Sequence, residues 1–170
     1  HLGGIQAFLG IEADLAAYGK VVAGGYPIGV VAGRPEYMDA LDGGPWSFGD
    51  DSIPEADMTW FAGTFVRHPV AMAAAKASLT HLRDAGPRLQ STLNERTTRW
   101  VDEMNAHFEA ERAPMRIEHF SSMFLVTYTE YQEYSDLLQH ELVLRDVFSR
   151  EGRPLFWSVA HSRSEERRVG

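Results

Sequence analysis

The sequence predicts an α/β fold with two regions, the end of a larger sheet-containing domain and a small α+β domain. Three observations lead to this prediction. Gly-rich segments with short β-branched runs come first, two helical patterns follow, and beyond residue 114 strand-like and helical patterns alternate. We expect residues 1–85 to belong to the larger domain, 86–113 to form a connecting helix and 114–161 to form the small domain.

Two short strands open the chain in this reading. Residues 19–25 indicate a short buried strand end followed by a turn. Residues 28–33 indicate a second buried strand, in which glycine allows another backbone to approach closely. A short helix is expected over residues 35–41, because Pro35 suits a first helical turn.

A long loop is expected over residues 42–63, where turn-forming residues are frequent. A loop of this length inside a domain is usually functional or part of an interface. Four aromatic residues lie within it or beside it: Trp46, Phe48, Trp60 and Phe61.

Helical patterns dominate the middle of the chain. Residues 68–85 predict a helix, because Pro69 suits its first turn and an alanine-rich run follows. Residues 88–112 predict a longer helix whose apolar residues recur at helical spacing. The small domain is expected to hold two strands, a helix and a last strand, at residues 115–120, 123–128, 134–150 and 154–159.

Composition narrows the function classes. The 170 residues, 44% of them apolar and 24% charged, are typical of a soluble globular protein with a core. The sequence has no cysteine, and its seven histidines lack metal-ligand spacing, so we expect no metal site. A net charge of −8 argues against a nucleic-acid or anionic-lipid partner, because both need clustered positive charge. No apolar run reaches the roughly 20 residues of a membrane span, and we expect a cytoplasmic protein.

Both ends of the sequence have unusual features. The chain begins at His1 inside a Gly-rich stretch without a methionine, so we expect further residues upstream. Residues 162–170 are abruptly polar and charged after an apolar run. We interpret them as a non-native tail, and a genuine charged tail fits equally well.

Lys20 is the main candidate for chemistry. The chain has two lysines, Lys20 and Lys76, and Lys76 lies in the alanine-rich helix as an ordinary surface charge. No other charged residue occurs from residue 16 to residue 33, so we expect Lys20 to be desolvated. Desolvation favours the neutral amine, which is the form that attacks an aldehyde. A structural or surface lysine is the alternative interpretation, and the G-x-x-x-x-G-K order of a phosphate loop is absent.

The surrounding string resembles the class III aminotransferases, which include the glutamate-semialdehyde aminomutase group. The resemblance rests on residues 14–33, on Ala62-Gly63-Thr64-Phe65 and on the segment from His68 to Ala75. The family pattern has an acidic residue, Gly-Lys, a Gly-Gly-x-Pro turn, and later Gly-Thr-Phe before Asn-Pro-Leu-Ala. Lys20 matches the lysine of this pattern and Thr64 its threonine, whereas His68 departs from the asparagine.

A narrower resemblance is to the aminotransferase domains of hybrid peptide–polyketide synthases. It rests on the sequence GDDSIP at residues 49–54, on Arg67-His68-Pro69 and on EGRPLF at residues 151–156. His68 fits this narrower group. The resemblance as a whole covers residues 2–161.

The resemblance implies pyridoxal 5′-phosphate as the cofactor, held covalently by Lys20. It also implies that the freed Lys20 amine acts as the general base. Gly63 would let the backbone approach the cofactor, and Thr64 would bind the cofactor phosphate from the neighbouring subunit of a homodimer. A turn residue is the alternative role for Thr64. Arg153 could hold a carboxylate or phosphate-like group of the substrate, or be a loop charge.

The fold implied is a fragment of a fold-type I aminotransferase, inactive alone because other cofactor residues lie upstream. The activity implied is transfer of an amino group from an amino acid to a keto acceptor. A β-keto acyl thioester on an acyl carrier domain is the acceptor suggested by the narrower resemblance. The alternatives are a glutamate-semialdehyde-type aminomutase and a non-catalytic relative. We expect the loop at residues 42–65 to lie at the dimer interface and to be exposed in this chain alone.

Overall fold

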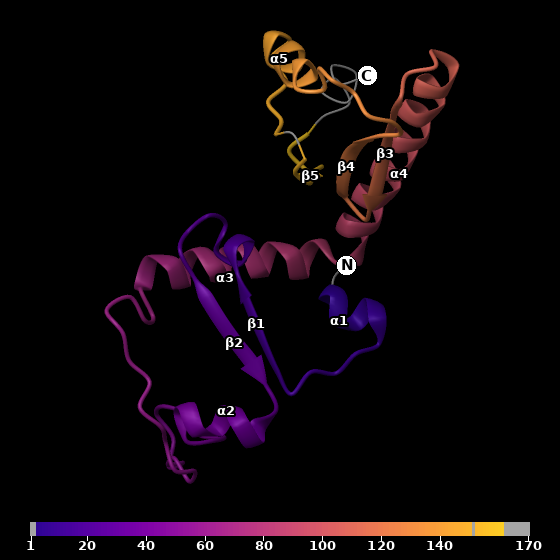
Figure 1. Cartoon of the computed structure of the whole chain (residues 1–170). Coiled ribbons are helices and arrows are strands. Elements are labelled where there is room, and N and C mark those ends of the chain that lie inside the picture. Colours follow the sequence, from indigo (N-terminus) through magenta and orange to yellow (C-terminus); the bar gives the residue numbers. More distant parts are fainter. Residues whose placement is uncertain (1–2, 151, 162–170) are drawn as a thin grey trace. The chain divides into compact units, whose positions relative to one another are not determined.

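The structure is a computed structural model that describes residues 3–150 and 152–161. Residue contacts divide it into a first unit, residues 3–86, and a second unit that begins at Pro87. Figure 1 shows the elements of both units along the chain. The charged tail at 162–170 lies outside the described residues. No helix in the part of the chain that is described is long and apolar enough to cross a membrane.

The first unit is built on a two-stranded antiparallel hairpin. Strand β1 pairs with β2 in a register that runs from Leu15 opposite Gly33 to Gly19 opposite Gly29. The 3-10 helix η1 lies in the connection between the strands and packs on α3. The elements of this unit are α1 (Gly4–Leu9), β1 (Leu15–Gly19), η1 (Lys20–Ala23), β2 (Gly29–Gly33), α2 (Pro35–Asp42) and α3 (Pro69–Ala85).

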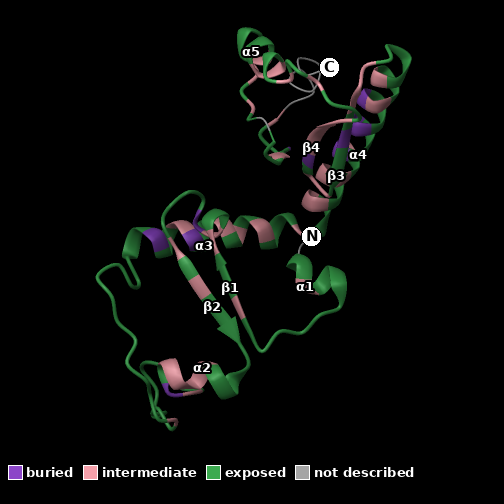
Figure 2. Cartoon of the chain, in the orientation of Figure 1, coloured by how far each residue is buried: buried purple, intermediate pink, exposed green. Residues whose placement is uncertain are grey.

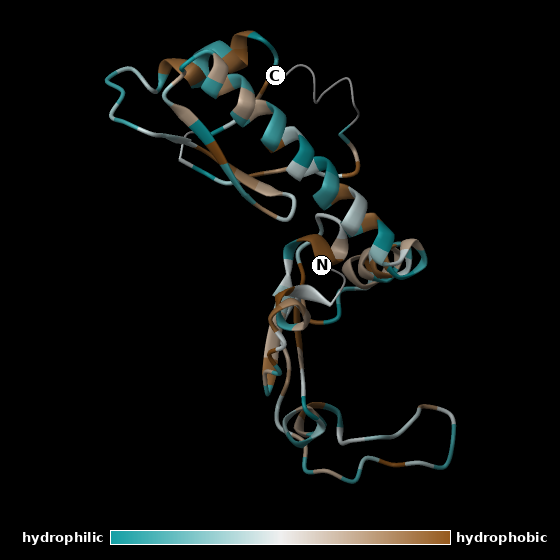
Figure 3. Cartoon of the chain, turned by 90° about the vertical axis from the view of Figure 1, so that its right-hand side faces the viewer, coloured by the Kyte–Doolittle hydropathy of each residue, from teal (hydrophilic) through white to brown (hydrophobic). Residues whose placement is uncertain are grey.

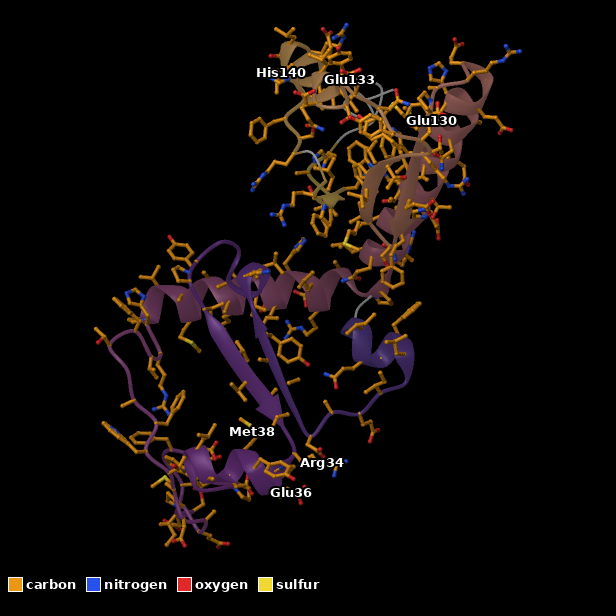
Figure 4. The ribbon with its side chains drawn as sticks, in the orientation of Figure 1. Arg34, Glu36, Met38, Glu130, Glu133 and His140 are labelled. Atoms are coloured by element: carbon orange, nitrogen blue, oxygen red, sulfur yellow. The ribbon has the colours of Figure 1, made fainter. Side chains whose placement is uncertain are left out.

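Arg34 closes the end of the hairpin away from η1. Its N–H donates to the carbonyl of Asp14 at 3.0 Å, and its guanidinium lies 3.3 Å from the Asp14 carboxylate. Glu36, in the first turn of α2, lies 3.8 Å from the same guanidinium nitrogen (Figure 4). Asp14, the acidic residue of the family pattern, therefore has a local structural partner.

The strand predicted over residues 28–33 forms as β2, whereas the first strand lies earlier than predicted, because β1 ends at Gly19 and residues 20–23 form η1. The expectation that the strands are buried is wrong for this chain. Most of β1 and β2 is exposed, and Val31 keeps 53% of its surface (Figure 2). The hairpin is a two-stranded ladder rich in glycine and alanine, and helices contact it at its ends. An apolar strand is buried only where a second layer covers its face.

The predicted loop is confirmed between α2 and α3, where no helix or strand forms from Gly43 to His68. Its start is anchored, because the N–H groups of Glu55 and Ala56 both donate to the carbonyl of Gly43. The expected exposure of its aromatics is also confirmed: Phe48 is 99% exposed and Trp60 is 73% exposed.

The helix predicted over residues 68–85 is confirmed as α3, which has Pro69 in its first turn. It ends at Gly86, whose φ of 66° lies in the left-handed region that favours glycine. Two small side chains, Ala71 and Ala75, are its buried residues. They are four positions apart and so lie on one face of the helix.

The second unit is a three-stranded antiparallel sheet with a long helix against it. Strand order is β3-β4-β5, and α4 packs on β3. Hydrophilic and hydrophobic residues alternate along the long helix in Figure 3, and the buried residues of α4 recur at helical spacing, which is the pattern of a helix with one buried face. The elements are α4 (Pro87–Ala110), β3 (Met115–Phe120), β4 (Met123–Tyr128), α5 (Leu137–Leu144) and β5 (Leu155–Phe156).

Aromatic residues form the centre of the core of this unit. Trp100 of α4 meets Phe124 edge-on at 4.9 Å between ring centroids and Trp157 at 5.2 Å. Val101 and Met104 of α4 add to the same cluster, together with Ile117 of β3. Such edge-to-face pairs add to the stabilisation from buried apolar area.

Two predicted elements are longer than the structure has them. The helix predicted over residues 134–150 is wrong in length, because α5 ends at Leu144 and Asp146 has a left-handed φ of 61°. The strand predicted over residues 154–159 is limited to β5. A turn replaces it at Ser158, whose N–H donates to Nδ1 of His161 at 3.0 Å.

Candidate functional site

Lys20 lies where β1 ends and η1 begins. Its φ of 53° places a non-glycine residue in the left-handed region, at a cost of order 1–3 kcal/mol that the surroundings must offset. The side chain borders an open hollow whose other lining residues include Tyr26, Pro27 and Ile28. Among the residues that the structure describes, no ion pair or hydrogen bond engages the Lys20 amine.

The expected desolvation of Lys20 is wrong for this chain, because its side chain is exposed. The residues around it are mostly small, and Val21, the next residue, is 81% exposed. Small neighbours leave a long side chain open to solvent unless another layer covers it. The absence of other charges from residue 16 to residue 33 has a different effect, which is that the amine has no local counter-ion.

The backbone beneath Lys20 is held against α3. Ala23, the last residue of η1, is fully buried, and η1 packs on the helix that buries Ala71 and Ala75. Gly24 follows with a φ of 57°, and a Cβ there would lie 3.0 Å from Oγ of Ser78. The backbone of η1 therefore lies close to α3, because the side chains between them are small.

Gly63 and Thr64 lie in a turn that leads into α3. The N–H of Val66 donates to the carbonyl of Gly63 at 3.1 Å, and the N–H of His68 donates to the carbonyl of Phe65 at 3.3 Å. A Cβ at Gly63 would lie 3.1 Å from Cγ2 of Val66, so a larger residue would crowd the turn. Thr64 is exposed, and within the described ranges nothing bonds its hydroxyl.

Arg153 belongs to the second unit, whereas Lys20, Gly63 and Thr64 belong to the first. It is exposed, and its N–H donates to the carbonyl of Arg150 at 3.3 Å. It borders an apolar cavity of about 270 Å³ that is also lined by Trp100 and Phe124. All three candidates of the first unit are connected to α3. Lys20 is connected through η1, which packs on the helix, and Gly63 and Thr64 through the turn that precedes it.

Asp50 shapes the loop between α2 and α3 through its contacts with Ser52. The hydroxyl of Ser52 donates to the Asp50 carboxylate and its N–H does so at 2.8 Å, and these two bonds lower the pKa of Asp50. Metal binding has no support in the described part of the chain, where no group of three histidine, aspartate or glutamate side chains converges.

Residues 4–141 match the model of the aminotransferase class-III family, and the chain belongs to that family. The match runs from α1 into α5 and so includes the Lys20 segment and the Gly63-Thr64 turn.

Solved structures that align with this chain include several transaminases. A β-phenylalanine aminotransferase from Variovorax paradoxus aligns at 24% identity with a TM-score of 0.75, over 99% of this chain and 39% of its own. An omega-transaminase from Sphaerobacter thermophilus aligns at 24% identity with a TM-score of 0.72. The alignment covers 98% of this chain and 39% of the transaminase. A transaminase with PLP bound aligns at 22% identity with a TM-score of 0.74. The alignment covers 96% of this chain and 38% of that transaminase.

These alignments confirm the predicted fold class. The chain is a partial α/β structure of the fold-type I transaminases and spans about 39% of the length of the first solved structure it matches. Pyridoxal phosphate is the cofactor that family membership assigns. The described residues fit that group, because the first unit presents a lysine amine and a threonine hydroxyl that are both free to bind it.

One part of the site has no counterpart in the sequence-based predictions. The helix over residues 68–85 was expected, but its contact with η1 beneath Lys20 was not. The available signal was the placement of small residues at Ala71, Ala75 and Ser78, which recur on one helical face. A run so rich in alanine hides that signal, because small residues also occupy the exposed positions.

Proposed function

We propose that the full-length protein is a pyridoxal-phosphate-dependent transaminase that moves an amino group from an amino acid to a keto acceptor. The observation that carries this proposal is the free, unpaired amine of Lys20, fixed at the start of η1 in a chain of the class III family. A lysine without a counter-ion is suited to bind an aldehyde covalently.

The proposed roles follow from what each group can do. Bound pyridoxal phosphate supplies an electron sink for the carbon–hydrogen bond of the amino donor. Nζ of Lys20 would hold the cofactor. As a free amine, Nζ would accept the proton from the α-carbon of the amino donor and would deliver it to the C4′ carbon of the cofactor. Thr64 donates its hydroxyl hydrogen to the phosphate, and Gly63 keeps the turn free of a side chain.

The experiment compares the two lysines in the full-length protein. Lys20→Ala is expected to abolish both the visible absorbance of lysine-bound cofactor and the transfer of an amino group. Lys76→Ala serves as the control, because Lys76 is an exposed lysine on α3. Borohydride reduction followed by peptide mass spectrometry is expected to place the cofactor on Lys20. Retained attachment and activity in Lys20→Ala would refute the proposal.

We also propose that the protein acts as a homodimer, with the loop of residues 42–65 at the interface. The support is the exposure of Phe48, Trp60 and Phe61 in a segment without helix or strand. Exposed aromatic residues are enriched at interfaces. In this arrangement Thr64 binds the cofactor phosphate of the partner subunit. A monomeric and fully active full-length protein, measured by sedimentation, would contradict it.

For the acceptor we propose a β-keto acyl chain carried as a thioester on an acyl carrier domain. The support is the likeness of residues 49–54, 67–69 and 151–156 to domains of hybrid synthases. Tethering raises the effective concentration of such a substrate and offsets the repulsion between two acidic partners. Arg153 is the candidate for holding an anionic group of the substrate. Preference of the enzyme for free keto acids over a carrier-bound chain would refute this acceptor.

Two alternatives use the same residues differently. In a glutamate-semialdehyde-type aminomutase, Lys20 and Thr64 would keep their roles while the amino group migrates within one molecule. An isotope-labelled donor separates the two, because label that appears in a different molecule indicates transfer. A non-catalytic relative would not need an amine at position 20, and the presence of Lys20 favours catalysis.

A further inference from the structure

The left-handed backbone of Lys20 needs an external support, and α3 is the element in contact with it. Lys20 has a φ of 53°, and it begins η1, a single turn of four residues. A residue in a sparsely populated backbone region persists only where its surroundings determine its conformation. The hairpin contributes to this through its register, which ends at Gly19 opposite Gly29.

The contact between η1 and α3 consists of small residues on both sides. Ala23 is fully buried, while Ala71 and Ala75 are 5% and 6% exposed. One turn further along α3, Ser78 faces Gly24, where even a Cβ would lie 3.0 Å from the serine oxygen. A side chain at position 24 would therefore crowd Ser78. Figure 2 shows the buried part of α3 in purple.

The turn is also closed by its own hydrogen bonds. The N–H of Gly24 donates to the carbonyl of Val21 at 3.0 Å, and the N–H of Tyr26 donates to the carbonyl of Ala23 at 3.1 Å. These bonds hold residues 21–26 in a compact turn that directly follows Lys20. Because Lys20 and Ala23 belong to the same single turn of η1, we expect a shift of Ala23 away from α3 to move Lys20 as well.

We propose that Ala75 and Ser78 of α3 are positioning residues for Lys20, acting through Ala23 and Gly24. Their small side chains set the distance of η1 from the helix and thereby the place of the Lys20 amine. The inference rests on the proposed role of Lys20 and extends it to residues that do not touch the cofactor. Reacting groups must be held to a fraction of an ångström, so a displaced amine loses rate even when it still binds.

The test is Ala75→Leu in the full-length protein, with Ala77→Leu as the matched control. Ala77 is exposed on the same helix, and the same substitution there has the same helix propensity. We expect Ala75→Leu to lower kcat on the order of 10²-fold, with KM for the amino donor nearly unchanged. The rate at which apoenzyme attaches the cofactor, and the pH midpoint of the bound cofactor's absorbance, should change as well. Ala77→Leu should leave all four quantities at their original values.

A second variant separates positioning from a general loss of structure. Ala23 is fully buried in η1, which packs on α3, so Ala23→Gly removes a buried methyl group and is expected to make room for the larger residue. In the Ala75→Leu background it is expected to restore part of kcat and the absorbance midpoint, a coupling that independent defects would not show. Should Ala75→Leu fail to fold, Ala75→Val is measured in the same way.

The outcomes distinguish this inference from the function on which it rests. Equal behaviour of the variants at positions 75 and 77, or absence of rescue by Ala23→Gly, would overturn the positioning role. In that case loss of cofactor attachment in Lys20→Ala would still support the transaminase. Retained attachment in Lys20→Ala would instead overturn both.

Discussion

Asn105 of α4 pairs with the backbone of Ile117 in β3 as a neighbouring strand would. Its Nδ2 donates to the Ile117 carbonyl at 3.0 Å, and the Ile117 N–H donates to its Oδ1 at 2.8 Å. Because β3 is an edge strand of the sheet, these bonds satisfy backbone groups that would otherwise be open to another chain.

Asn105→Ala is expected to lower the free energy of unfolding of the second unit by about 1–3 kcal/mol, because it leaves both Ile117 backbone groups without a partner. Urea denaturation gives the change, and hydrogen exchange should show lost protection at the Ile117 amide. Asn94→Ala on the same helix is the control, since within the described residues its side chain makes no such pair of hydrogen bonds. Equal midpoints for the two variants would rule out the edge-closing role.

Trp100→Ala is expected to lower the free energy of unfolding of the second unit by about 3–5 kcal/mol, because it opens a cavity between Phe124 and Trp157. Trp100→Phe should cost clearly less, since the indole N–H of Trp100 has no hydrogen-bond partner within the described ranges. Thermal unfolding gives the change in stability for both variants at position 100. Phe148→Ala, at a position 87% exposed, should stay within about 0.5 kcal/mol of the unaltered chain.

Asp146→Gly is expected to stabilise the second unit by about 0.5–1 kcal/mol. Asp146 has a φ of 61° just after α5, where glycine avoids the clash between a Cβ and the backbone. Asp136→Gly, at the start of the same helix with a φ of −64°, should have no such benefit. Chemical denaturation gives the free energy of unfolding of both variants. A lower value for Asp146→Gly than for the unaltered chain would contradict backbone strain at Asp146.

Thr64→Val is expected to weaken cofactor binding by the full-length protein about tenfold, because a hydrogen bond to a charged phosphate is lost. Thr59→Val, an exposed threonine in the same loop, should leave the affinity unchanged. The dissociation constant is measured by titration of apoenzyme with pyridoxal phosphate. An unchanged constant in Thr64→Val would assign this residue to the turn alone.

Local sequence signals determined most of the elements. The strands at residues 115–120 and 123–128 and the helix of the alanine-rich run follow from periodicity, propensity and Pro69, which act within a few residues. The family also followed from local strings, since residues 4–141 match the class III model. Lys20 was found because its segment has no other charge, and its role stays a prediction.

The tertiary structure decided what depends on contacts between distant segments. Burial of the hairpin strands and desolvation of Lys20 were expected from apolar composition, but burial requires a covering layer, which composition does not specify. The length of α5 depended on one left-handed residue, Asp146, which no periodicity indicates. The support beneath Lys20 depended on η1 packing on α3, with Gly24 facing Ser78, across more than fifty residues of sequence. Packing of small residues leaves no pattern until the chain has folded, because each is unremarkable by itself.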